Sequence, residues 1–142
     1  MQNMAQKAKA YCDERGLRFT DPRRHVLNII AKSKKPIGAY DILEALGKHL
    51  KNPQPPNVYR ALDFLQEHGF IHRIESLDAY NICHSDHHHK GSQYMICDDC
   101  GSASEIHMCD MPGDMKKKAA SQGFGQKYWN LEIHGTCKDC AR

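Results

Sequence analysis

The chain has 142 residues, and 20 Lys and Arg stand against 17 Asp and Glu, for a formal net charge of +3. This length allows one ordinary domain or two small ones, and the charge neither requires nor excludes nucleic-acid binding. The sequence shows no apolar run that could span a membrane and no signal peptide. Together with an odd number of cysteines, seven, this predicts a cytoplasmic protein with reduced thiols.

The first half predicts four short helices, each with its own start or stop signal. Thr20 can cap the second helix ahead of Pro22, and Pro55 and Pro56 open the fourth. Apolar side chains recur at helical spacing in all four segments. The residues expected to face inward are Met4, Ala8 and Tyr11; Val26, Leu27 and Ile30; Ala39, Leu43, Leu46 and Leu50; and Val58, Leu62 and Leu65.

Residues 70–75 and 79–83 predict two strands that form a hairpin after these helices. Helices followed by a hairpin are typical of a winged helix-turn-helix module, whose last helix enters the major groove. The N-terminal end of helix 56–68 carries Asn57, Tyr59 and Arg60. Arg60 can contact a guanine and Asn57 an adenine, while phosphate or sugar contacts are expected from Tyr40, Arg23, Arg24 and Lys51. The alternative is a plain helical domain with solvated charges.

A histidine-rich segment follows the hairpin, with His87, His88 and His89 in succession. Such a run indicates metal contact or simple solvation. Further candidate ligands flank it, namely His72, Cys83 and Glu105. Thiolate, imidazole and carboxylate donors suit Zn²⁺ in a tetrahedral site, so these residues predict a metal site at a hinge.

Two C-x-x-C pairs, Cys97 with Cys100 and Cys137 with Cys140, dominate the second half. Each pair can supply two thiolates from one turn, and four thiolates are typical of a closed structural zinc site. The alternatives are two disulfides or a redox pair, but neither pair opens a βαβ unit. A structural zinc can contribute about 10 kcal/mol to the folding of a small domain.

Between the cysteine pairs, the pattern predicts a strand over residues 102–107 and a helix that starts at Asp110 and Pro112, with Met115 and Ala119 inward. A second strand alternates Trp129, Leu131 and Ile133 with Glu132 and His134. So small a sheet leaves apolar surface, which favours pairing with a second copy. His107 and His134 are either a third, weaker metal site or ordinary polar residues, and Cys12 and Cys109 are expected to be free thiols.

The segments 56–65 (PNVYRALDFL) and 69–76 (GFIHRIES) resemble the ferric uptake regulator (Fur) family, and most of all its zinc branch, the zinc uptake regulators (Zur). The cysteine pairs and the histidine-rich connector follow in the family's order, so the resemblance covers nearly the whole chain. It implies an α+β protein in three parts. These are a winged helix-turn-helix domain in residues 1–83, a metal-binding connector in 84–92 and a small α/β dimerisation domain in 93–142.

The resemblance also implies two zinc ions per chain. The structural zinc would be held by Cys97, Cys100, Cys137 and Cys140. The regulatory zinc would be held by His72, Cys83, His89 and Glu105, with His88 or His87 as alternatives to His89 because the connector spacing differs from that of relatives. The DNA-contacting tyrosine and arginine carry over to Tyr40 and Arg60, and Asn57 stands where relatives usually have Thr or Ser.

The function this implies is a homodimeric repressor of zinc-uptake genes, whose binding to operator DNA is switched on by zinc. The alternatives within the family are sensors of iron, manganese or peroxide, and a zinc store or chaperone stands outside it. No catalytic role is expected, because the sequence lacks the H-E-x-x-H, G-x-S-x-G and phosphate-loop motifs.

Overall fold

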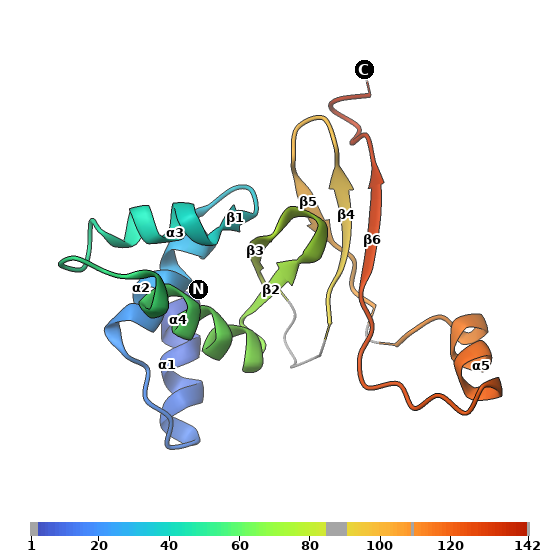
Figure 1. Ribbon diagram of the computed structural model, residues 1–142, viewed down its shortest axis with the longest axis horizontal. Helices are drawn as coiled ribbons and strands as arrows, with labels where there is room; N and C mark the ends of the chain where they lie inside the picture. The colour runs from blue at the N-terminus through green and yellow to red at the C-terminus, as the bar shows by residue number, and fades with distance from the viewer. Residues whose placement is uncertain (1–2, 85–90, 109, 142) are drawn as a thin grey trace. The chain divides into compact units, whose positions relative to one another are not determined.

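The computed structural model describes residues 3–84, 91–108 and 110–141, and the chain divides into two compact units, Met1–Cys83 and His84–Arg142 (Figure 1). The predictions that concern His87, His88, His89 and Cys109 lie outside the described residues. Within the described part of the chain, no helix has the length and apolar character needed to cross a membrane. The α+β class is confirmed, since each unit combines helices with a small sheet.

The four helices predicted for the first unit are confirmed as α1 (Met4–Glu14), α2 (Asp21–Lys32), α3 (Ala39–Leu46) and α4 (Pro55–Glu67). Their starts follow from capping chemistry. The Thr20 side chain accepts a hydrogen bond from the Arg23 N–H at the start of α2, as the sequence predicts. At the start of α4, the Asn57 side chain accepts from the Gln54 N–H over 2.8 Å.

A three-stranded antiparallel sheet completes the first unit, with strand order β1-β3-β2. The predicted hairpin is confirmed as β2 (Ile71–Ile74) and β3 (Ala79–Ile82), joined by a short 3-10 turn, η1 (Glu75–Leu77). We call residues 71–82 the wing. The added strand β1 (Ile37–Gly38) pairs with β3 and was not predicted, because two residues are too few to show a period.

The core of the first unit is formed mainly by the predicted apolar residues of the four helices together with Ile71, Tyr80 and Ile82. Burial of each large aliphatic side chain contributes about 1.5–3 kcal/mol. One prediction needs correction in α3, where Ile42 and Leu46 are fully buried while Leu43 is only half-buried. The predicted residues Ala39, Leu43, Leu46 and Leu50 all belong to or pack against the core, but the stripe also includes Ile42, which was not predicted.

Aromatic contacts join α1 to the end of α4. The Tyr11 hydroxyl lies 3.1 Å from Nδ1 of His68, and the two rings pack edge to face at 5.5 Å between centroids. Phe70, at the entry to the wing, packs edge-on against Tyr11 at 5.2 Å. The first helix is thus tied both to the end of α4 and to the start of the wing.

The second unit contains β4 (Gln93–Cys97), β5 (Ala103–Glu105), α5 (Gly113–Ser121) and β6 (Leu131–Gly135). Its sheet has the order β5-β4-β6, antiparallel between β4 and β5 and parallel between β4 and β6. Gly91 leads into β4 with φ +82°, and a Cβ there would lie 2.1 Å from the Trp129 carbonyl oxygen. Only glycine fits this close approach.

The helix α5 begins directly after Pro112, in agreement with the predicted start, but its predicted inward face is wrong for Met115. Among the described residues of this helix none is buried, Met115 is 48% exposed and Ala119 is half-buried. Figure 1 shows α5 apart from the β4, β5 and β6 strands of its own unit, so its apolar residues are left largely uncovered. Such a helix face is one that another chain can bury.

Candidate metal centres and DNA-contact surface

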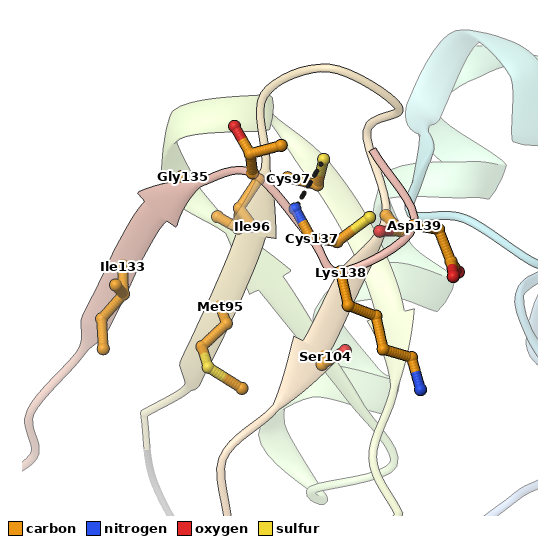
Figure 2. Close-up of a pocket in the computed structure, with 11 residues that line it drawn as sticks. Met95, Ile96, Cys97, Ser104, Ile133, Gly135, Cys137, Lys138 and Asp139 are labelled. Atoms are coloured by element: carbon orange, nitrogen blue, oxygen red, sulfur yellow. Dashed lines mark hydrogen bonds between the residues drawn. The ribbon is translucent and has the colours of Figure 1, made fainter. Parts of the chain in front are cut away.

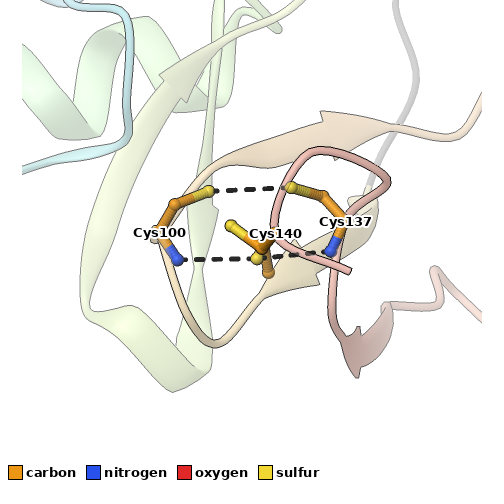
Figure 3. A group of neighbouring side chains, drawn as sticks. Cys100, Cys137 and Cys140 are labelled. Carbon is orange, nitrogen blue, oxygen red and sulfur yellow. Dashed lines mark hydrogen bonds between the residues drawn. The ribbon is translucent and has the colours of Figure 1, made fainter. Parts of the chain in front are cut away.

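The four paired cysteines converge on one point in the second unit. Cys97 ends β4 and Cys100 follows in the next turn, while Cys137 and Cys140 lie in the turn after β6 (Figure 3). The four sulfur atoms lie within 4.8 Å of one another, and Sγ of Cys100 and Sγ of Cys137 are 3.9 Å apart. A tetrahedron with Zn–S bonds of about 2.3 Å separates its sulfurs by roughly 3.8 Å. The cluster therefore has the size of a zinc site.

Backbone hydrogen bonds stabilise the ionised form of one of these thiols, Cys97, and a thiolate is the form that binds a metal cation. The N–H groups of Cys137 and Cys100 donate to Sγ of Cys97 over 3.3 and 3.5 Å, and they lower the pKa of that thiol to about 6. Hydrogen bonds with Cys137, Cys97 and Cys100 raise the pKa of the Cys140 thiol to about 12. Four ionised thiolates at these separations would repel one another, so they could coexist only around a positive ion.

His134 does not join a metal cluster with His107 among the described residues. Its Nδ1 lies 3.1 Å from Asp98 Oδ1, and its Nε2 lies 3.3 Å from Glu132 Oε2. Hydrogen bonds to Asp98 and then Glu132 raise the pKa of His134. This contact ties β6 to the turn that carries Cys97 and Cys100, and nothing in the spacing of these residues predicts it.

In the first unit, the wing brings His72 and Cys83 together. His72 lies opposite Asn81 in the β2·β3 register, and Cys83 follows two residues after Asn81 on the same face. The Cys83 N–H donates to the Phe70 carbonyl over 2.9 Å, which fixes the residue just beyond the end of β3. Both side chains are buried, and a ring nitrogen of His72 lies within 4.8 Å of the Cys83 sulfur. This pair offers one nitrogen and one sulfur ligand.

Glu105 ends β5 in the second unit and is half-buried. Its carboxylate accepts a hydrogen bond from the backbone N–H of His84 over 3.2 Å. The two residues belong to the same unit. The carboxylate is therefore held close to the start of the histidine-rich connector.

The predicted DNA-contact residues of α3 and α4 are largely open to solvent. Tyr40, at the start of α3, is 79% exposed, and Tyr59 is 53% exposed. Arg60 is exposed beside Tyr59, while Asn57 is half-buried with its Oδ1 engaged in the cap of α4. The N-terminal part of α4 thus presents a large aromatic side chain and a guanidinium that is not buried.

The two arginines at the start of α2 have partners within the first unit. The Arg23 guanidinium stacks over the Phe64 ring at 3.8 Å and donates to the Arg18 carbonyl. Arg24 pairs with Asp21 over 3.1 Å. Arg23 braces α2 against α4, and its predicted role in DNA contact stays a prediction.

One face of the second sheet is hollowed and partly apolar. Met95, Ser104 and Ile133 lie side by side across the three strands, since Met95 is in register with both of the others (Figure 2). They line a pocket of about 560 Å³ that reaches Cys97 and Cys137. Met95 is 51% exposed and Ile133 is 49% exposed, so this face leaves large apolar side chains in water.

Comparison with known proteins places these features in a family. The model of the Ferric uptake regulator family matches residues 14–134. The zinc uptake regulation protein of Escherichia coli (strain K12) is 37% identical over 140 residues, which cover 98% of this chain and 82% of that protein. The family predicted from the sequence is therefore correct.

Solved structures give the same result. A zinc uptake regulator complexed with zinc and DNA is similar at a TM-score of 0.91 and 35% identity, covering 99% of this chain and 97% of that one. The crystal structure of holo XcZur is similar at a TM-score of 0.85 and 39% identity, covering 96% of each chain. The chain belongs to the ferric uptake regulator family of transcriptional regulators.

Proposed function

We propose that this protein is a zinc-responsive, DNA-binding transcriptional repressor of zinc-uptake genes, which acts as a homodimer in the cytoplasm and is not an enzyme. The observation that carries the proposal is the similarity, over 99% of the chain, to a zinc uptake regulator complexed with zinc and DNA. Iron, manganese and peroxide sensing stay as alternatives within the family. The donor set of His72 and Cys83, which includes a thiolate, favours zinc among these.

The structural zinc of this proposal is held by Cys97, Cys100, Cys137 and Cys140. The sulfur spacing of the cluster supports it, as does the set of backbone N–H groups that stabilise the Cys97 thiolate. A site closed by four protein ligands leaves no position for a reacting water. Its role is therefore to hold β4 and β6 together.

The regulatory zinc is proposed to bind His72, Cys83, Glu105 and one connector histidine, with His89 favoured over His88 and His87. The pairing of His72 with Cys83 on one face of the wing supports the first half of this site. The hydrogen bond from the His84 N–H to Glu105 supports the second, because it holds the carboxylate near the connector.

A bound zinc ion would link side chains from different parts of the chain, because it accepts nitrogen, sulfur and oxygen ligands at the same time. In the proposed mechanism, His72 and Cys83 bind the ion from the first unit, while Glu105 and the connector histidine bind it from the second unit. These ligands restrict the separation of the two α4 helices in a dimer to that of adjacent major grooves. Zinc then raises the affinity for DNA only to the extent that it binds the DNA-competent state more tightly than the other states. The coupling free energy between zinc binding and DNA binding is typically about 1–3 kcal/mol.

The decisive test is binding to promoter fragments of metal-uptake genes, titrated separately with buffered zinc, iron(II) and manganese. Activation by zinc alone at the lowest free concentrations supports the proposal. Equal activation by iron or manganese assigns the protein to another branch, and absence of binding with every metal favours a zinc store.

Arg60 is the residue of α4 for which we expect the largest loss of DNA affinity. Replacement by alanine removes a guanidinium that can bind a guanine edge, so zinc-dependent operator affinity should fall by about 1–3 kcal/mol. Zinc content should stay unchanged. Fluorescence anisotropy with labelled operator measures the loss, and Gln66→Ala, at an exposed position near the other end of α4, is the matched control. Equal affinity for both variants would show that α4 does not read the DNA in this way.

The hollowed face of the second sheet is proposed to lie in the dimer interface. Ile133→Lys places a charge on the same face as Met95, another half-exposed apolar side chain that lines this pocket, so the dimer dissociation constant should rise at least about tenfold. Analytical ultracentrifugation of the zinc-loaded protein measures it. Leu77→Lys, a similar change at an exposed apolar residue of the wing, should leave the dimer intact, and an unaltered dimer with Ile133→Lys would place the interface elsewhere.

A further inference from the structure

A small basic groove in the first unit lies outside both proposed metal sites. One stripe of α2 carries Arg24, Asn28 and Lys32 at intervals of about one helical turn, with His25 next to Arg24, and His49 follows the end of α3. Together with Ile29 these residues line a hollow of about 190 Å³. This volume corresponds to roughly six water molecules, which is room for one tetrahedral oxyanion and part of its hydration shell.

The two histidines of the groove are stacked. Their ring centroids are 4.7 Å apart and the rings are inclined by only 13°. Within residues 3–84, 91–108 and 110–141, neither ring takes part in a hydrogen bond or an ion pair. Since His25 is half-buried and His49 exposed, both imidazoles have ring nitrogens that a ligand can reach.

The charges around the groove favour an anion over a cation. Arg24 and Lys32 are positive, and the acidic side chain that acts on His25 is Asp21, which already pairs with Arg24. Burial, then Arg24 and His49, lower the pKa of His25. Among the residues that the structure describes, none that lines the hollow carries a carboxylate or thiolate, so a divalent metal would meet two imidazoles and two positive charges.

We propose that this groove binds a phosphate group, held by the imidazole N–H donors of His25 and His49 and by the charges of Arg24 and Lys32. The phosphate group can come from the DNA backbone or from free phosphate. The DNA source rests on the function proposed above, and is suggested by the place of His49 in the segment that leads into α4. The free-phosphate source does not depend on that function.

Binding of an anion here is linked to protons. An anion beside the stacked rings offsets the repulsion that Arg24 and His49 exert on the His25 imidazole, so it favours the protonated form of His25. Phosphate binding should therefore be stronger near about pH 6 than near about pH 8, since histidine changes its charge between these values. An arginine and lysine site without histidine would show the opposite dependence, because inorganic phosphate itself carries more negative charge near about pH 8 than near about pH 6.

The first experiment titrates the zinc-loaded protein with inorganic phosphate, and follows the imidazole signals by proton–nitrogen correlation NMR. Sodium chloride at matched ionic strength gives the baseline. Saturable shifts of His25 and His49 that chloride does not reproduce, and that weaken about two- to fivefold in Lys32→Gln, are expected. His107→Gln, an exposed histidine of the other unit, is the matched control and should leave these shifts unchanged.

The second experiment measures operator binding of Lys32→Gln and His49→Gln over a range of salt concentrations. Loss of affinity with a smaller salt dependence identifies a DNA phosphate as the occupant. Phosphate-dependent shifts without any effect on DNA binding identify free phosphate. The proposal is overturned if phosphate moves the histidine signals no more than chloride does and both variants bind DNA like the parent. Because the first experiment contains no DNA, it stands even if the protein proves not to be a regulator.

Discussion

Replacing Cys97 by serine should unfold the second unit while the first unit stays folded. Cys97 accepts two backbone N–H groups and is one of four sulfurs within 4.8 Å of one another. Loss of one ligand removes much of a metal-binding free energy of about 10 kcal/mol, which is comparable with the whole stability of a small domain. In the described part of this unit few side chains are buried, chiefly Tyr94, Ile96 and Trp129, so packing cannot replace the metal.

Hydrogen exchange is the direct measurement for this variant. The amides of residues 93–97 and 131–135, which pair in the parallel β4·β6 ladder, should lose protection, whereas those of α2 and α4 should keep it. Zinc content should fall by at least one ion per chain. Cys12→Ala removes a buried thiol of the first unit and should leave the zinc content unchanged. A folded Cys97→Ser protein with full zinc response would refute the division into structural and regulatory sites.

Replacing Cys83 by alanine should abolish the response to zinc without unfolding the protein. Cys83 lies just beyond the end of β3, and its backbone N–H still bonds to the Phe70 carbonyl in the variant. The variant should bind operator DNA with the affinity of the zinc-free parent at every zinc concentration. Added zinc should raise the affinity of the parent protein for operator DNA by about 5- to 150-fold. Bound DNA should raise the affinity of the regulatory site for zinc by the same factor.

The matched control for this variant is Asn81→Ala. Asn81 lies opposite His72 and two residues before Cys83, on the same face of the sheet, but supplies no ligand to the proposed site. It should keep the zinc response, which separates loss of a ligand from damage to the wing. A Cys83→Ala protein that still responds to zinc like the parent would remove Cys83 from the site.

The order and type of most elements could be predicted from the sequence because the signals are local, but β1 and the central strand β4 (Gln93–Cys97) were not predicted. Thr20 and Pro22 give the start of α2, and the two C-x-x-C pairs show by spacing alone that their sulfurs can meet. The inward face of α3 was predicted less well. Ile42 and Leu43 are adjacent apolar residues, and only the packing against α2 and α4 selects the first of them.

Long-range polar contacts could not be predicted, because no local pattern encodes them. His134 meets Asp98 across the sheet, whereas the sequence offered His107 as its partner. The basic groove likewise depends on the loop that returns His49 to α2. The prediction for α5 failed for a different reason. An amphipathic stripe indicates that a helix face is buried, but it does not show whether the same chain or another chain buries it.

The parallel pairing of β4 with β6 gives the two units different folding kinetics. Residues 93–97 pair with residues 131–135, and the chain between them includes both β5 and α5. Closing this long loop costs conformational entropy before the strands make any contact. In the first unit the helices and the tight β2–β3 hairpin can form locally, before β1 pairs with β3. Refolding should therefore show a fast phase for residues 3–83 and a slow phase for the second unit, and zinc should accelerate only the slow one, because the cysteine cluster closes the same loop.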